Sequence, residues 1–81
     1  MKNKYTIDIS ALRKAMIDSD IRSVSDLSRK SGVGRDTLSK IFGGKMLPSF
    51  DVAVKLIWVL NLTPEEAGKI FFVPNLREHV S

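Results

Sequence analysis

Apolar residues recur at intervals of three and four along most of the chain, which is the spacing of one face of an α-helix. In residues 9–17 the repeat is carried by Ile9, Leu12, Ala15 and Met16. Asp8 or Ser10 is placed to cap the start of this helix. Strict alternation of polar and apolar residues, as in a strand, is confined to residues 5–9. The pattern therefore predicts an all-α domain.

Capping and turn residues mark the next helix. Ser23, with Asp26 three residues later, is an acidic variant of the capping box and starts a second helix over residues 24–30. Gly32 then supplies the positive φ of a tight turn. We expect this turn to span only a few residues before a further helix begins.

Two more helices are predicted between glycine and asparagine stops. The third covers residues 35–42, and the pair Gly43-Gly44 is expected to end it as a left-handed cap. The fourth opens at a proline-serine pair, covers residues 50–60 and ends at Asn61.

The fifth helix has a complete start signal. Thr63 is its N-cap, a proline takes the first helical position and a glutamate the third. The helix is expected to reach Phe72. We predict a helical domain over residues 1–73 and an extended or loosely docked C-terminal tail over residues 74–81.

Chain length and composition agree with this picture. A chain of 81 residues has room for one small domain, and 43% hydrophobic with 27% charged residues is a globular composition. Helical spacing predicts a core made of Leu12, Met16, Leu27, Val33, Leu38, Ile41, Phe50, Ala53, Leu56 and Leu60.

The sequence lacks the residues that disulfides, metal sites and common catalytic sites require. The chain has no cysteine and one histidine, His79, so we expect no disulfide, no metal site and no cofactor. The sequence also has no glycine-rich phosphate loop and no paired carboxylates of the kind that indicate an enzyme. The longest apolar stretch, residues 56–60, is too short to span a membrane, and no signal core follows the N-terminus. We expect a cytoplasmic protein that is not an enzyme.

The positive charge is concentrated in one half of the chain. Residues 1–47 hold ten Lys or Arg and five Asp, a net charge of +5, whereas residues 48–81 hold three basic and four acidic residues, a net charge of −1. A basic half joined to a neutral, more apolar half is typical of a nucleic-acid reader with a packing module. The alternative is an ordinary solvated surface.

The second and third predicted helices form a helix-turn-helix pattern. Leu27, Val33 and Leu38 supply its apolar contacts, and the glycine at position 32 lies at the turn. Ser28 is small where the two helices would cross, because a larger side chain there would push them apart.

The segment from Ser23 to Leu62 resembles the Cro and phage-repressor type of helix-turn-helix regulators, also called the xenobiotic-response-element family. The matching residues are Ser23 to Val33, Thr37 to Ile41, Gly44-Lys45, Pro48-Ser49, Leu56, and Leu60 to Thr63. The resemblance implies a compact five-helix lambda-repressor-like fold. It also implies that the third helix lies in the DNA major groove and that the protein binds a double-stranded operator as a homodimer.

The sequence departs from the family pattern at three positions. Val24 stands where the family often has glutamine, Gly34 where it often has a serine cap, and Gly43 where it often has asparagine. Two of these are commonly DNA-contacting positions, so we expect either a weaker affinity for DNA than is usual in the family or contacts made by other residues.

The exposed side of the third helix supplies the candidate base-reading residues. These are Arg35, Asp36, Thr37, Ser39 and Lys40. Arg35 is the strongest candidate, since a guanidinium can hold guanine through two parallel hydrogen bonds. Asp36 either accepts from cytosine or acts as a helix cap near the phosphates.

Residues at helix ends and on the second helix are candidate phosphate contacts. Ser23, Ser25 and Lys45 lie where helix ends meet the sugar-phosphate chain. Arg29 and Lys30 face solvent on the second helix. For each position alone, the alternative is an ordinary exposed polar residue.

An apolar face is expected on the outer side of the fourth helix. Val54 and Trp58 lie there at helical spacing, and Phe72 ends the fifth helix close by. An exposed tryptophan with such neighbours would form a partner interface. Alternatively, the tail residues Val73 and Leu76 cover Trp58.

Two functions are consistent with these features. The first is a sequence-specific DNA-binding transcriptional regulator, a small phage or mobile-element repressor or Cro-like protein that dimerises through the fourth and fifth helices. The second is an antirepressor or modulator that binds another repressor protein through a helix-turn-helix scaffold.

Overall fold

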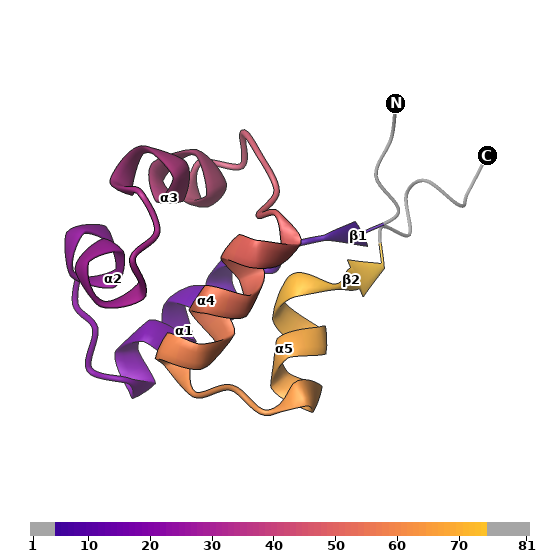
Figure 1. Cartoon of the computed structure of the whole chain (residues 1–81). Helices are drawn as coiled ribbons and strands as arrows, with labels where there is room; N and C mark the ends of the chain where they lie inside the picture. Colours follow the sequence, from indigo (N-terminus) through magenta and orange to yellow (C-terminus); the bar gives the residue numbers. More distant parts are fainter. Residues whose placement is uncertain (1–4, 75–81) are drawn as a thin grey trace.

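The computed structural model describes residues 5–74 and confirms the all-α class (Figure 1). Its elements are β1 (Tyr5–Thr6), α1 (Ile9–Asp18), α2 (Val24–Ser31), α3 (Arg35–Phe42), α4 (Phe50–Leu60), α5 (Pro64–Phe71) and β2 (Val73–Pro74). The five predicted helices are all present, each within about a turn of its predicted bounds.

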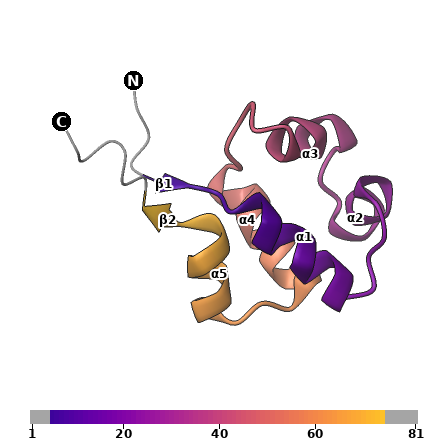
Figure 2. The same ribbon diagram turned by 180° about the vertical axis from the view of Figure 1, so that it is seen from behind.

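In Figures 1 and 2, α1 and α4 overlap in the middle of the domain, with α2 and α3 on one side of them and α5 with the small sheet on the other. The contacts agree with the views, because α2 packs on both α3 and α4 while α1 packs on α5. The helix-turn-helix pair α2 and α3 thus lies at the opposite end of the domain from α5 and the small sheet.

Side-chain caps start four of the five helices. The Asp8 carboxylate accepts from the Ala11 N–H at 3.0 Å, so Asp8 and not Ser10 is the cap of α1. Ser23, Ser49 and Thr63 accept in the same way at α2, α4 and α5. The helix starts therefore follow directly from the local sequence.

The helix ends follow the predicted glycine and asparagine stops. Gly32 has φ 77° and Asn61 has φ 54°, both left-handed as a C-cap requires. Within the predicted pair Gly43-Gly44, Gly43 keeps a right-handed conformation with φ −83°. The left-handed residue is Gly44, with φ 74°, one position later.

The buried core contains nine of the ten predicted residues. Phe50 was predicted wrongly: it is the first residue of α4 and is 79% exposed. In its place the core gains five residues that were not predicted, Ala15 and Ile21 together with Ala67, Ile70 and Phe71 of α5. The fifth helix is therefore a core helix, with Ile70 and Phe71 turned inward.

A short antiparallel sheet joins the two ends of the described chain. Tyr5 pairs with Pro74 and Thr6 with Val73. The Asp8 N–H donates to the Ile70 carbonyl at 2.8 Å and extends this connection to α5. The first two residues after Phe72 are thus docked; the predicted tail beyond Pro74 lies outside the described residues.

A matched pair of glycine substitutions tests the role of backbone conformation. Gly32→Ala should lower the free energy of unfolding by about 1 kcal/mol, because φ 77° strains any residue with a Cβ atom. Gly68→Ala should raise it by about 0.5–1 kcal/mol, because Gly68 lies inside α5 with open space around its Cα. Urea unfolding measures both. A destabilising Gly68→Ala would contradict this assignment.

The capping box of α5 predicts an acid sensitivity. The Thr63 N–H donates to Glu66 Oε1 at 2.9 Å, and this bond, with the contact to the Thr63 hydroxyl, lowers the pKa of Glu66 below its ordinary 4.5. A depressed pKa stabilises the fold above the ordinary value, and that stabilisation is lost as the pH falls through the folded pKa.

Glu66→Gln should therefore be less stable than the parent near pH 7, and the difference should shrink at about pH 3. Chemical unfolding at both pH values measures it. A difference that does not change with pH would show that the Glu66 charge contributes nothing.

Candidate nucleic-acid interface

The turn between α2 and α3 is held by hydrogen bonds from two serines. Ser28 Oγ donates to the Val33 carbonyl at 2.7 Å, and the Val33 N–H donates to Ser31 Oγ at 3.1 Å. The Val33 side chain is buried in the core between the two helices. Ser28 is thus more than a small residue at a crossing, because its hydroxyl ties α2 to the turn that leads into α3.

The third helix has one buried face and one polar, exposed face. Leu38 and Ile41 are fully buried. Of the predicted base-reading residues, Arg35, Asp36, Ser39 and Lys40 are exposed, and Thr37 is half-buried at the edge. The Gly34 cap leaves the start of the helix without a side-chain hydrogen bond. The structure thus brings the predicted reading residues together on a single exposed helix face.

The predicted phosphate contacts lie in different environments. Ser25 and Lys45 are exposed. Ser23 is exposed too, but its hydroxyl already accepts from the Asp26 N–H at 3.0 Å as the cap of α2. The remaining two, Arg29 and Lys30, form ion pairs with the Asp26 carboxylate.

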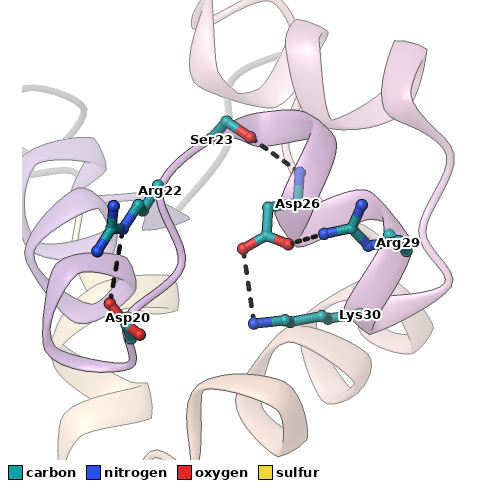
Figure 3. Close-up of polar contacts among 6 residues, drawn as sticks. All are labelled: Asp20, Arg22, Ser23, Asp26, Arg29 and Lys30. Carbon is teal, nitrogen blue, oxygen red and sulfur yellow. Dashed lines mark hydrogen bonds and ion pairs between the residues drawn. The ribbon is translucent and has the colours of Figure 1, made fainter.

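Figure 3 shows Asp26 between Arg29 and Lys30. Its carboxylate accepts from the Arg29 guanidinium and lies 3.6 Å from Lys30 Nζ. Partial burial raises the pKa of Asp26, but the Lys30 ammonium and the Arg29 guanidinium outweigh that effect and hold the pKa below its ordinary value. Asp26 is therefore charged at neutral pH and offsets part of the positive charge on α2.

The same close-up shows a second ion pair before α2, between Arg22 and Asp20 at 3.7 Å. Both side chains are almost fully exposed, so the pair contributes little to stability. By contrast, no ion pair within residues 5–74 involves Arg35, Lys40 or Lys45.

Sequence reasoning missed two features near this surface. Arg13 of α1 places its guanidinium over the Phe42 ring, 5.0 Å from the centroid, at the end of α3. That contact joins helices distant in sequence, so no local pattern could reveal it. The ion pairs of Asp26 with Arg29 and Lys30 could have been predicted from the sequence, since residues three and four apart lie side by side on a helix.

The predicted partner residues lie at two places, Val54 and Trp58 one turn apart on α4 and Phe72 beside the small sheet. Trp58 is 80% exposed near the end of α4, and Val54 is half-buried one turn before it. Phe72 is partly exposed, but its ring meets Tyr5 edge to face at 6.1 Å, beside the sheet. Val73 pairs with Thr6 in that sheet.

Two features are absent from the part of the chain that the structure describes. Within residues 5–74 no group of three His, Cys, Asp or Glu side chains is arranged to hold a metal ion. No helix in the same range is long and apolar enough to cross a membrane.

A tight helix-turn-helix with a polar, partly basic second helix defines a DNA-binding domain. Comparison with protein families agrees, because the model described as the Cro/C1-type HTH DNA-binding domain matches residues 11–69. The chain belongs to this family. No curated protein and no solved structure shows a significant match to it.

Proposed function

We propose that the protein is a sequence-specific transcriptional regulator that reads an operator with α3. The observation that carries the proposal is the exposed polar face of α3 in a Cro/C1-type domain. The opposite face of the same helix is anchored in the core by Leu38 and Ile41. Arg35 and Lys40 are the cations on that face, and neither takes part in an ion pair among the described residues.

The remaining parts of the proposal follow from this role. The protein binds duplex DNA as a homodimer, because two tethered readers on neighbouring half-sites raise affinity without any new contact. It acts as a small repressor or Cro-like protein of phage or mobile-element type, in the cytoplasm. It needs no cofactor and catalyses no reaction, since its residues position and attract DNA.

A second function is favoured by one observation. Trp58 is 80% exposed, and a large exposed aromatic side chain is typical of a protein interface. In this alternative the protein is an antirepressor or modulator and binds another repressor. A gel shift with the DNA beside its own gene, run with and without a repressor encoded next to it, distinguishes the two functions. A regulator shifts the DNA alone, whereas a modulator changes only the shift that the repressor causes.

Substitutions on α3 test the reading of DNA. Arg35→Ala should weaken operator binding by about 1–3 kcal/mol and relax the preference at one base pair, as loss of a bidentate guanine contact would. Lys40→Ala should weaken binding more evenly across sequences. Lys69→Ala on α5, an exposed cation at the other end of the domain, is the matched control.

Binding measured by fluorescence anisotropy on operator and on scrambled DNA separates these effects. If both α3 variants bind like the parent and the Lys69 control, α3 is not the reading helix.

The ion pairs of Asp26 predict the salt dependence of binding. With Arg29 and Lys30 held, Arg35, Lys40 and Lys45 are left to neutralise phosphates, which gives a log-log slope of about −3 per subunit. Asp26→Asn should release the two held cations and steepen the slope to about −4 to −5. Salt titrations of both proteins measure this. Equal slopes would show that Asp26 does not restrain Arg29 and Lys30.

A further inference from the structure

An apolar stripe runs along α4 away from the core. Phe50, Val54 and Trp58 follow one another at intervals of four, so they lie in a row on one side of the helix. Phe50 is 79% and Trp58 80% exposed, whereas Val54 between them is half-buried. Large aromatic side chains this exposed at both ends of a single helix face indicate a surface that binds another protein.

The two ends of the stripe differ in shape. Beside Phe50 lies an apolar pocket of about 170 Å³, whose walls include Tyr5, Pro48, Ala53, Phe71 and Phe72. At the other end the Trp58 side chain projects into solvent. Hence one helix carries a hollow at its start and a protruding tryptophan near its end.

This arrangement is complementary to itself. In a twofold interface each contact occurs twice, because residue i of one copy meets residue j of the other and the reverse. Phe50 and Trp58 are eight residues apart, roughly 12 Å along the helix. If two copies of α4 cross antiparallel near Val54, each Trp58 lies at the level of Phe50 of the other copy, where the pocket opens beside Phe50.

The charges that border the stripe favour the same orientation. Asp51 lies near the start of α4 and Lys55 one turn later, and the two form an ion pair at 3.4 Å. An antiparallel crossing brings the acidic part of one helix toward the basic part of the other. A parallel crossing would instead place like charges together, which is unfavourable at an interface.

We propose that two copies of this chain associate through antiparallel α4 helices, with Trp58 of each copy seated in the apolar pocket beside Phe50 of the other. The proposal deepens the homodimer of the proposed function and rests on it for its biological role. The surface is formed by α4 and its neighbours and leaves the exposed side chains of α3 free, so the association does not require DNA.

The full chain reports this association without a label, because Trp58 is its only tryptophan. Sedimentation equilibrium without DNA should show a mass that rises from one chain to two with concentration. Over the same range the tryptophan emission should move to shorter wavelength, because the indole leaves water. A failure of DNA binding with this transition intact would overturn the proposed function but not the interface.

Variants of the stripe test which residues carry the association. Trp58→Ala should weaken self-association by at least about 30-fold, as at an interface hot spot, and Phe50→Ala should weaken it as well. Ile17→Ala is the matched control, because Ile17 is 74% exposed on α1, outside the stripe, and its loss should leave the dimer unchanged. Circular dichroism confirms that each variant is folded.

Charge reversal tests the orientation. Asp51→Lys or Lys55→Asp alone should weaken self-association, because each makes the border of the stripe carry a single sign. The double variant D51K/K55D should recover it, because an antiparallel crossing again brings opposite charges together, whereas a parallel crossing would not. If the double variant associates no better than the single variants, the antiparallel crossing is wrong.

Three outcomes of the sedimentation and emission measurements overturn the interface. The first is a monomer whose emission stays that of an exposed indole at every concentration. The second is a monomer with short-wavelength emission, in which the chain itself covers Trp58. The third is a dimer that Trp58→Ala and Phe50→Ala do not weaken.

Discussion

The placement of α3 depends on how Val33 is held. Its side chain is buried, its carbonyl accepts from the Ser28 hydroxyl and its N–H donates to Ser31. These contacts fix the conformation of the turn between α2 and α3. Each of these helices has only eight residues and would be only marginally stable in water on its own. A helix that reads DNA must present its side chains in one orientation, and here that orientation is set by a buried apolar residue with satisfied backbone groups.

Local signals explain how much of this fold could be predicted. Caps such as Ser23 and Thr63 and the stops at Gly32 and Asn61 act within four residues, so the sequence alone locates the helices. The pairing of Tyr5 with Pro74 could not be predicted in this way, because it joins the two ends of the described chain through strands of two residues each.

The misassignment of Phe50 has a physical reason too. Phe50 has the spacing of a core residue, but it occupies the first position of α4, where the helix has only begun and its side chain projects beyond the core. For the predicted pair Gly43-Gly44 the sequence does not say which residue is left-handed, because either glycine accepts that conformation, and the structure has it at Gly44. On α3 the residue pattern sufficed, since helical spacing alone separates Leu38 and Ile41 from the polar face.

The positive charge available at the site is smaller than a count of its basic residues indicates, because some of them form ion pairs. The first half of the chain is basic, but Asp26 holds Arg29 and Lys30. Uniform phosphate attraction strengthens binding to any sequence, whereas base contacts distinguish one sequence from another. In the proposed function, a carboxylate that pairs with cations on α2 lowers the phosphate contribution and leaves base contacts to α3, an arrangement that would favour selectivity over affinity.

The composition of α4 reveals a constraint on the whole domain. Within Phe50–Leu60 only Asp51 and Lys55 are polar, and a helix that is apolar almost all round is normally covered on every side. Here Ala53, Leu56 and Leu60 fill the core, while Phe50 and Trp58 remain in water. Among the described residues, α1, α2, α3 and α5 do not cover the outer face of α4, since Phe50 and Trp58 are 79% and 80% exposed. A second copy that covers the outer face resolves this conflict, because it buries the aromatic stripe and keeps both recognition helices free.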